Sequence, residues 1–281
     1  MAETVVDLRN VWFTYDGENY AVKDVSFKIP RGEFAAIIGN NGSGKTTLLK
    51  LILGLLKPTR GEVWVAGVNT KNAKVSELAK RIGLVFQNPN EQLFAVTVRE
   101  EIEFGLKNLK LPREEIDKRV EEVVELFNLR KFLDLSPRFL SRGDKQKVAL
   151  AAVVAMKPEI MLMDEPTTGQ DHRDSRQVMD LAKRLNEEMG MTIILVTHQI
   201  VTVAEYAKRV ILMNNGVVVK DDDVRSVLTD IDALASCSLL PPQITLLSNK
   251  LKPLGINNRI VKVDEMVEEI WRCVNARSRQ V

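Results

Sequence analysis

Short apolar runs recur along the chain, and between them lie longer stretches in which apolar residues return at helical spacing. The runs predict strands covered on both faces, because such strands are apolar at successive positions. They occupy residues 34–38, 82–86, 160–163, 191–196 and 210–213. The helical pattern covers residues 47–56, 97–106, 112–129, 145–156 and 171–189. Strands that alternate with helices predict an α/β fold built on a parallel sheet.

Two other parts of the chain show different patterns. Apolar and polar residues roughly alternate over 5–15 and 21–29, and a glycine-bounded run covers 61–67, which together predict an antiparallel β subdomain. From about residue 230 the pattern mixes helix and strand, which predicts a small α+β appendage. We therefore expect one large domain over 1–229 and a C-terminal appendage over 230–281, for which dimerisation is one open role.

A glycine-rich loop follows the first of the apolar runs. It fits the pattern G-x-x-x-x-G-K-[ST] and consists of Gly39, Asn40, Asn41, Gly42, Ser43, Gly44, Lys45 and Thr46. A strand, this loop and a helix form a phosphate-binding context, because a helix N-terminus offers unpaired N–H groups to an anion. Lys45 can reach the β- and γ-phosphates of a nucleotide, and the Thr46 hydroxyl can bind Mg²⁺. The loop predicts nucleoside triphosphate binding, and the alternative is a glycine-rich turn that binds nothing.

Three further apolar runs end in residues that can do chemistry. Gln87 follows one run, the pair Asp164-Glu165 a second, and His198 a third. Ligands bind where the strands of parallel α/β sheets end, so Asp164 can hold Mg²⁺ through water and Glu165 can accept a proton from an attacking water. Gln87 can hydrogen-bond a metal-bound water, and His198 lies where a phosphate can be placed. Each of them also has a structural interpretation, as an ordinary polar residue of a solvated loop or turn.

Tyr15 and the segment 141–144 are the remaining candidates. Tyr15 precedes a predicted turn, where its ring can stack on a base or simply pack at a strand end. Ser141 and Gly143 precede an alanine-rich helix, and Ser141 can serve as the N-cap of that helix and nothing more. The residue types alone leave both alternatives open.

Charge and composition exclude several classes of protein. The chain has 281 residues with Lys+Arg 40 against Asp+Glu 38, so its formal charge is +2 and no strong field favours nucleic acid as a partner. No apolar run approaches the ~18 residues of a membrane span, and the start of the sequence lacks a signal-peptide pattern. We expect a cytoplasmic protein whose contact with any membrane goes through a partner.

Taken in chain order, these residues resemble the motifs of the ATP-binding-cassette ATPases. The motifs are Tyr15, GNNGSGKT at 39–46, Gln87, LSRGDKQ at 140–146, IMLMDEP at 160–166, TTGQD at 167–171 and His198. The resemblance spans almost all of residues 5–225. It implies an ATP-hydrolysing P-loop NTPase core with an antiparallel β subdomain and a helical signature subdomain.

The resemblance also implies a role for each residue, with ATP and Mg²⁺ as cofactors. Catalysis would use Glu165 as general base, with His198 and Lys45 at the γ-phosphate. Mg²⁺ would be bound by Thr46, Gln87 and Asp164. Nucleotide binding would use Tyr15 on adenine, then Gly39, Asn40, Asn41, Gly42, Ser43, Gly44, Lys45, Thr46, Thr47 and Gln87. In that family two cassettes close face to face, so that Ser141 and Gly143 of one subunit would complete the ATP site of the other.

Within the family, the chain looks like the energy-coupling-factor and cobalt-transporter ATPases. The similar segments are 87–95, Thr97-Val98, Phe104-Gly105 and 240–246. The likeness implies a homodimer or heterodimer of cassettes at the cytoplasmic face of the cell membrane. The dimer would drive a transmembrane scaffold and a substrate-binding membrane subunit that import a vitamin or a transition-metal ion. Residues 88–94 would lie beside the groove that receives the scaffold.

The chain departs from the usual signature Leu-Ser-Gly-Gly-Gln at Arg142 and Asp144, and Gln170 stands where leucine is common. Asp144 would repel a phosphate by about 1 kcal/mol if partly screened, whereas an arginine can help. Two other functions therefore stay open: a cassette of another importer, and a nucleotide-gated subunit with weak hydrolysis. A soluble cassette of DNA repair or translation is disfavoured, because the interval 87–141 has no room for a long arm and basic clusters are absent.

Overall fold

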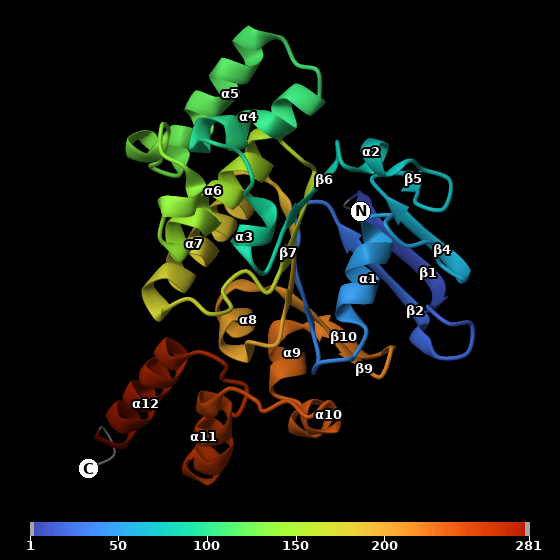
Figure 1. The fold of residues 1–281 in the computed structure, drawn as a ribbon. Coiled ribbons are helices and arrows are strands. Elements are labelled where there is room, and N and C mark those ends of the chain that lie inside the picture. The colour runs from blue at the N-terminus through green and yellow to red at the C-terminus, as the bar shows by residue number, and fades with distance from the viewer. Residues whose placement is uncertain (1–2, 279–281) are drawn as a thin grey trace.

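The computed structural model describes residues 3–278 and contains two sheets with helices around them (Figure 1). A six-stranded sheet has the order β10-β9-β3-β8-β7-β6, and a four-stranded sheet has the order β2-β1-β4-β5. The strands are β1 Thr4–Thr14, β2 Tyr20–Pro30, β3 Phe34–Ile38, β4 Arg60–Val65, β5 Val68–Asn69, β6 Ile82–Val85, β7 Ile160–Asp164, β8 Thr192–Thr197, β9 Arg209–Asn214 and β10 Val217–Asp223. Neighbours within β9-β3-β8-β7-β6 are parallel, whereas β10 and the smaller sheet pair antiparallel. The predicted α/β fold with an antiparallel β part is confirmed.

Helices surround the larger sheet and continue into the C-terminal part of the chain. They are α1 Lys45–Ile52, α2 Val75–Leu78, α3 Pro89–Gln92, α4 Val98–Asn108, α5 Arg113–Leu126, α6 Arg142–Ala155, α7 His172–Met189, α8 Ile200–Tyr206, α9 Val224–Leu228, α10 Ile231–Ser236, α11 Gln243–Leu251 and α12 Val263–Ser278. Helices α4, α5 and α6 pack together at one end of the molecule and form the predicted helical subdomain (Figure 1). Within residues 3–278 none of these helices has the length and apolar character that crossing a bilayer requires.

Successive residues of the central strands enter two different cores. In β3, Ala36 and Ile38 belong to the core shared with α4 to α8, whereas Ala35 and Ile37 belong to the core shared with α1 and the smaller sheet. Strands β7 and β8 alternate in the same way. Because neighbouring side chains of a strand point to opposite faces, a strand buried on both faces must be apolar throughout. This double burial explains the short apolar runs of the sequence.

The parallel strands end at one edge of the larger sheet. Their last residues pair across the sheet: Ile38 with Thr197, Val196 with Asp164, and Met163 with Val85. From these ends the chain continues into the glycine-rich loop, His198, Glu165 and Gln87. The register therefore aligns the candidate residues along one edge, where ligands of such sheets bind.

Two helices begin earlier than the apolar pattern predicts. Helix α1 starts at Lys45 rather than at residue 47, because Gly44 adopts a left-handed conformation with φ 101° and begins the helix directly after the loop. Helix α6 starts at Arg142, ahead of the apolar pattern of 145–156, because the Ser141 hydroxyl caps it as the N-cap interpretation of Ser141 expects. The first turns of both helices are polar and carry no apolar signal. Lys45 and Arg142 consequently both lie in the first turn of a helix.

The C-terminal appendage is helical, so the α+β pattern predicted for it is wrong. Between residues 230 and 278 the structure has helices and no strand. The β-branched stretch around Ile260 finds no partner strand, because side chains of α11 and α12 bond its backbone instead. The Thr245 hydroxyl donates to the Ile260 carbonyl oxygen (2.8 Å), and the Val261 N–H donates to Glu265 (3.2 Å). These bonds occupy the backbone groups that a strand would have used.

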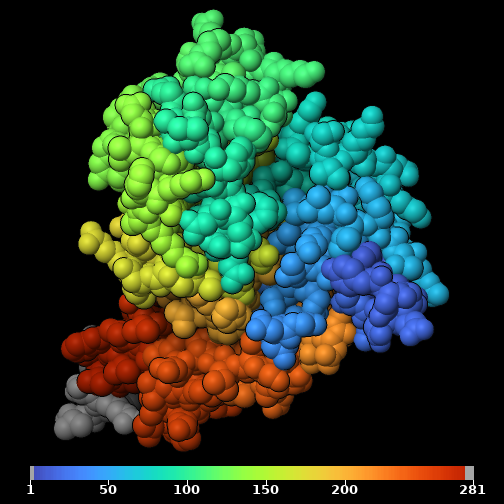
Figure 2. All heavy atoms as spheres, in the orientation of Figure 1, coloured from blue at the N-terminus to red at the C-terminus, as the bar shows by residue number. Residues whose placement is uncertain are grey.

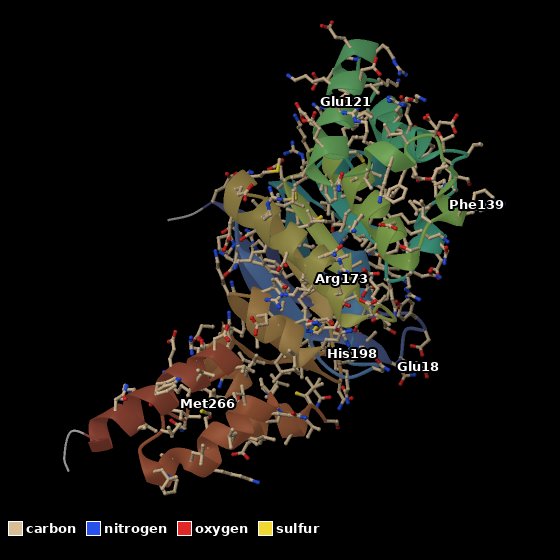
Figure 3. The ribbon with its side chains drawn as sticks, turned by 90° about the vertical axis from the view of Figure 1, so that its left-hand side faces the viewer. Glu18, Glu121, Phe139, Arg173, His198 and Met266 are labelled. Atoms are coloured by element: carbon tan, nitrogen blue, oxygen red, sulfur yellow. The ribbon has the colours of Figure 1, made fainter. Side chains whose placement is uncertain are left out.

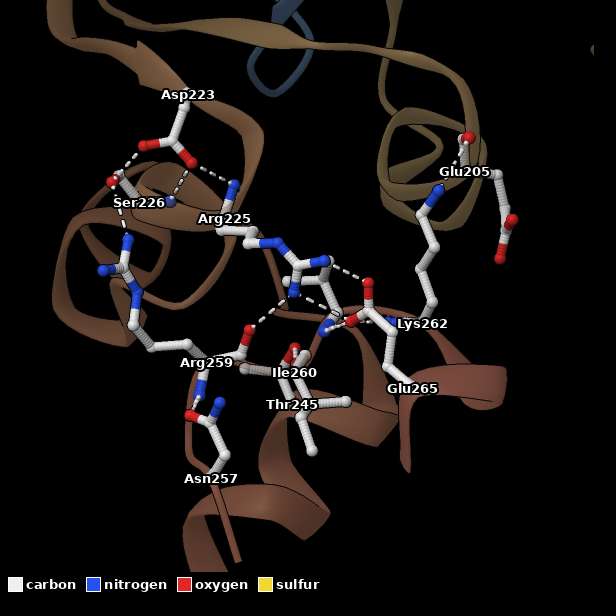
Figure 4. A network of polar contacts seen from close by, with 11 residues as sticks. Glu205, Asp223, Arg225, Ser226, Thr245, Asn257, Arg259, Ile260, Lys262 and Glu265 are labelled. Carbon is white, nitrogen blue, oxygen red and sulfur yellow. Dashed lines mark hydrogen bonds and ion pairs between the residues drawn. The ribbon is translucent and has the colours of Figure 1, made fainter. Parts of the chain in front are cut away.

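Ion pairs and hydrogen bonds attach the appendage to the rest of the chain (Figure 4). Arg225 of α9 donates to the Glu265 carboxylate (2.9 Å) and to the Arg259 carbonyl oxygen (3.1 Å). Lys262 donates to the Glu205 carbonyl oxygen of α8 (3.1 Å). Burial alone would raise the pKa of Glu265, but the hydrogen bonds from Arg225 and from backbone N–H groups lower that pKa overall. The appendage is thus tied to both α8 and α9, which pack on the larger sheet.

Candidate functional site

The glycine-rich loop leaves no room for a side chain at either of its ends. A Cβ on Gly39 would lie 2.4 Å from the Met213 carbonyl oxygen, and a Cβ on Gly44 would lie 2.5 Å from the Ala21 carbonyl oxygen. The positive φ of Gly44 also favours glycine. The loop is therefore held closely against β2 and β9. Helix α1 begins directly after the loop, and its first turn has no acidic residue. An acidic residue there would repel an anion bound at the helix N-terminus.

Lys45 is buried in this loop, and its ammonium group contacts two carbonyl oxygens. Nζ donates to Gly39 O (2.7 Å) and Asn40 O (2.9 Å), and the residue is 7% exposed. Burial lowers the pKa of Lys45, and the nearby charges of Glu165 and Asp164 partly oppose this shift. A buried cation gains from a bound anion, because burial has removed the water that would otherwise solvate it. The geometry therefore suits the binding of a polyphosphate.

Glu165 is 8% exposed and brings two strand ends together. Its Oε1 lies 2.6 Å from His198 Nδ1 and also accepts the His198 N–H (3.1 Å). Its Oε2 accepts from the hydroxyls of Thr197 (3.0 Å) and Thr168 (3.4 Å). Because a carboxylate oxygen only accepts, His198 Nδ1 is the donor, and Nε2 is the ring nitrogen that can face a ligand. The structure joins the predicted Glu165 and His198 into one unit, and His198, which is labelled in Figure 3, is exposed.

The backbone at Glu165 is unusual. Its φ is 45°, which is uncommon for a residue other than glycine and costs about 1–3 kcal/mol. The Glu165 N–H donates to the Val196 carbonyl oxygen of β8 (2.8 Å). The chain therefore turns sharply at the end of β7 and directs this carboxylate toward β8 and His198. Strain of this kind is often found where a side chain must be aimed at a ligand.

Thr46, Gln87 and Asp164, the predicted magnesium ligands, lie along the same edge. Burial and the charge of Glu165 raise the pKa of Asp164, and nearby lysines oppose this shift. Within residues 3–278 no three His, Cys, Asp or Glu side chains gather as a metal site. A hydroxyl, an amide oxygen and one carboxylate nevertheless fit Mg²⁺, which takes few protein oxygens and completes its shell with phosphate. The donor set therefore fits magnesium bound together with a nucleotide.

Tyr15 lies beside the start of α1. Its Oη is 3.1 Å from Thr47 Oγ1, and its ring meets Phe13 edge to face with the centroids 4.8 Å apart. The residue is 62% exposed. The ring is therefore packed at the strand end along one edge, and much of it stays open to a base. Both sequence interpretations of Tyr15 are compatible with this position.

Ser141 and Gly143 lie at the start of α6 and are not joined to the glycine-rich loop. No hydrogen bond or ion pair connects either residue to residues 39–46 in the part of the chain that the structure describes. The Ser141 hydroxyl accepts the Asp144 N–H (3.1 Å) and donates to the Asp144 carboxylate (2.7 Å). A Cβ on Gly143 would lie 2.2 Å from the Asp174 carboxylate of α7. The structure thus places the signature against α7, not at this chain's own phosphate loop.

Three contacts at the site are absent from the sequence prediction. Thr168 and Thr197 bond the Glu165 carboxylate, and Arg142 Nη2 donates to the Thr168 carbonyl oxygen (2.6 Å). The position of Thr197 at a strand end, beside His198, was a usable signal. Arg142 and Thr168 come from segments far apart in the chain, so no local pattern indicates their contact.

Comparison with known proteins identifies the family. Residues 22–168 match the family model described as "ABC transporter". The chain belongs to the ATP-binding-cassette (ABC) transporter ATPases. This ABC ATPase is 42% identical over 275 residues to the energy-coupling factor transporter ATP-binding protein EcfA1 of Caldanaerobacter subterraneus subsp. tengcongensis, covering 95% of this chain and 99% of that protein. It is 39% identical to EcfA of Methanocaldococcus jannaschii, covering 85% and 86%.

Solved structures agree with the sequence relatives. The ABC ATPase is similar to cbiO1 from Clostridium perfringens, part of the ABC transporter complex cbiONQ, with a TM-score of 0.77 and 32% identity over 88% of this chain and 99% of that chain. It is also similar to the cassette MJ0796, solved as a dimer in a post-hydrolysis state bound to ADP and Pi, with a TM-score of 0.69 and 38% identity over 78% and 98%. The predicted P-loop NTPase core and the resemblance to energy-coupling-factor ATPases are confirmed.

Proposed function

We propose that this ABC ATPase hydrolyses ATP to power the import of a vitamin or a transition-metal ion through an energy-coupling-factor type transporter. The observation that carries the proposal is the unit of Glu165 and His198 at the sheet edge that also holds the buried Lys45. Relatives named energy-coupling factor transporter ATP-binding proteins, similar over most of their length, support the transporter class. Other subunits of the transporter would choose the substrate.

Each residue of the unit has a distinct role in this proposal. Lys45 and the N–H groups of the loop bind the phosphates, and Tyr15 stacks on the adenine. Glu165 accepts a proton from the water that attacks the γ-phosphate, a step that contributes about 10²–10⁴-fold to such reactions. With its ring protonated on both nitrogens, His198 donates from Nε2 to the γ-phosphate and from Nδ1 to the carboxylate of Glu165. The ring would therefore position both the base and the phosphate.

Thr46, Gln87 and Asp164 would hold Mg²⁺ with the nucleotide. When bound, Mg²⁺ would neutralise part of the phosphate charge. The raised pKa of Asp164 fits this role, because burial disfavours the ionised carboxylate until a cation compensates it. ATP and Mg²⁺ are therefore the cofactors of the proposal.

The proposal includes a dimer of two cassettes. Ser141 and Gly143 would complete the ATP site of the second subunit, since the structure keeps them away from this chain's own loop. The dimeric structure of MJ0796 supports such an arrangement for a similar cassette. A homodimer and a heterodimer with a similar ATPase fit equally well, because the signature and the loop lie on the same chain.

An apolar surface on the helical subdomain would bind the membrane scaffold at the cytoplasmic face of the membrane. Phe94 and Phe104 meet edge to face at 4.6 Å, and both are exposed. Phe139 is 86% exposed and points outward from the helical subdomain (Figure 3). A groove of about 390 Å³ beside them is lined by Asn90, Leu93, Phe94, Pro137, Arg138 and Lys145. Exposed aromatic clusters of this kind mark protein interfaces.

Phe139→Asp tests this surface. We expect it to abolish copurification with membrane subunits from the native source, while ATPase activity of the isolated chain stays unchanged. The matched control is Leu240→Asp, a similarly exposed position on the appendage. Equal loss of copurification in both variants would contradict the assignment to the helical subdomain.

We further propose that residues 230–281 form an appendage that stabilises the dimer through the appendage of the second subunit. Val263, Val267, Ile270 and Trp271 are exposed and recur at helical spacing on α12. The space-filling view shows the appendage at one end of the molecule, below the region of α8 (Figure 2). Trp271→Ala should weaken dimerisation measured by light scattering without ATP. Unchanged dimerisation would refute this part of the proposal.

Glu165→Gln tests the ATPase proposal directly. It should lower turnover by about 100-fold or more, because an amide cannot accept the proton. ATP binding should persist, since the loop and Lys45 are intact. Glu159→Gln is the control, because Glu159 directly precedes the opposite end of the same strand. Normal hydrolysis by Glu165→Gln would remove Glu165 as the base.

A nucleotide-gated subunit with weak hydrolysis is the second candidate. It is favoured by the bond between Ser141 and Asp144, which places a carboxylate where a phosphate would meet the signature. Steady-state ATPase assays of the chain alone and with a candidate partner cassette distinguish the two functions. Activity that appears only with the partner would favour an importer heterodimer, and absence of activity in both would favour the gated subunit.

A further inference from the structure

The signature turn makes a direct hydrogen bond to the loop that follows Glu165. Arg142 Nη2 donates to the Thr168 carbonyl oxygen at 2.6 Å. Hydrogen bonds from a charged donor are about twice as strong as neutral ones. Arg142 replaces the glycine that is usual in this signature, so a chain with the usual residue would lack the bond.

The loop is shaped to receive the guanidinium. Gly169 has φ 71°, and a Cβ on it would lie 3.0 Å from Arg142 Cζ. A second close approach follows, where Gly143, the next residue after Arg142, meets Asp174, five residues after Gly169. Two glycines therefore allow the start of α6 to lie directly on the segment 165–174. The contact is built from both sides and does not depend on one surface side chain alone.

Thr168 continues the contact to the general base. Its hydroxyl donates to Glu165 Oε2 (3.4 Å), and its N–H donates to the Glu165 carbonyl oxygen (3.2 Å). The carbonyl group of the same residue accepts from Arg142. A movement of the guanidinium would therefore shift both groups of Thr168 that contact Glu165.

From this geometry we propose that Arg142 is a positioning residue that couples the two ATP sites of the dimer. The inference rests on the proposed function, in which the signature of this chain meets the nucleotide bound by the second subunit. A γ-phosphate there would attract the Arg142 guanidinium. The loop 165–171 of this chain would follow, and with it the carboxylate of Glu165. Each site would then sense whether the other holds ATP.

Hydrogen exchange tests the contact without relying on hydrolysis. In Arg142→Ala the Thr168 and Gln170 amides should exchange about tenfold faster than in the unaltered chain, since the loop loses its charged hydrogen bond. Arg142→Lys should restore part of the protection. Arg173→Ala, which removes an exposed arginine from the start of α7, is the control and should leave these rates unchanged. Equal rates in Arg142→Ala and the unaltered chain would overturn the proposal.

Mixed dimers test the coupling between sites. One subunit is isotope-labelled and carries Lys45→Ala, so that ATP binds only at the other subunit's loop, opposite the labelled signature. ATP should change exchange at residues 165–171 of the labelled subunit, and adding Arg142→Ala to that subunit should remove the change. A change that persists without Arg142 would overturn the coupling.

Kinetics separates this inference from the proposed function. Arg142→Ala should lower kcat about tenfold with a smaller loss of ATP affinity, and Arg142→Lys should recover most of kcat. A tenfold loss of ATP affinity with an unchanged kcat would show that Arg142 contributes only to nucleotide binding and would overturn its positioning role. If the unaltered chain shows no ATPase activity, the proposed function fails, while the exchange experiment still decides whether Arg142 controls the loop.

Discussion

The phosphate loop and the signature turn are both helix N-termini, yet the sequence equips them differently. Helix α1 begins with a glycine and a buried lysine and has no acidic residue in its first turn. Helix α6 begins with a serine, an arginine and an aspartate that are already hydrogen-bonded to neighbours. A helix N-terminus can thus be open to an anion, as at α1, or already hydrogen-bonded by the protein's own side chains, as at α6.

This difference separates two kinds of effect. Changes at the phosphate loop should alter how this chain binds ATP. Changes at the signature turn should leave that binding intact and alter turnover, because the turn is proposed to act on the second subunit's nucleotide. Substitutions at each helix start test whether ATP binding and turnover change independently.

The largest effect is expected from Lys45→Ala. It should reduce ATP affinity by about 100-fold or more, because it removes the buried ammonium group that would pair with the phosphates. Titration with a fluorescent ATP analogue measures the affinity. Lys50→Ala, on an exposed position of the same helix, should change it by about twofold or less. Comparable losses in both variants would show that only the overall charge of α1 matters.

Gly143→Ala should leave ATP affinity unchanged and lower turnover about tenfold. The added Cβ would meet the Asp174 carboxylate at 2.2 Å, so the Asp174 side chain or the start of α6 must move. Steady-state kinetics over a range of ATP concentrations separates the two effects. Asp174→Ala in the same chain should restore part of the turnover by removing the clash. Full activity of Gly143→Ala would show that the close approach of the helices is dispensable.

Asp144→Asn should raise kcat/KM for ATP about fivefold. The variant removes a negative charge that repels a phosphate by about 1 kcal/mol, and it weakens the acceptor that holds the Ser141 hydroxyl. The gain should shrink as salt increases, because screening weakens the repulsion in the unaltered chain. Measurements of kcat/KM at low and high ionic strength check both statements. A loss of activity would mean that the carboxylate itself contributes to the site.

The smallest effect is a gain in stability from Asp164→Asn. Burial raises the pKa of Asp164, so the ionised carboxylate destabilises the ligand-free fold at any pH above that raised pKa. The amide should raise Tm by about 2 °C or more at neutral pH. The gain should disappear as the pH falls and Asp164 becomes protonated. Thermal unfolding across pH measures it, and Asp134→Asn at an exposed position should show no such gain.

The sequence predicted those features that depend on short stretches of the chain. Apolar runs located the central strands because double burial allows no polar residue there. Glycine spacing located the phosphate loop, and strand-end positions located Glu165 and His198. Both the fold class and the family followed from these local patterns and are confirmed. The assignment of individual roles to the site residues stays a prediction.

Other features depend on contacts between distant segments and were not predictable. The mixed helix and strand pattern from about residue 230 was misleading, because near Ile260 bonds from Thr245 and Glu265 replace a sheet partner. The bond from Arg142 to Thr168 joins α6 to the loop after β7, and the local sequence of neither segment indicates this contact. Local propensity describes what a segment can form, whereas tertiary packing decides which form it takes.

The alternation of burial along β3, β7 and β8 has an evolutionary consequence. Successive positions of one strand pack in different cores. A substitution at Ile37 changes the core shared with α1 and the smaller sheet, whereas one at Ala36 changes the core shared with α4 to α8. A single strand can therefore accumulate changes for one core without disturbing the packing of the other. Such a partition would let the packing beneath α6 change while the packing beneath α1 stays intact.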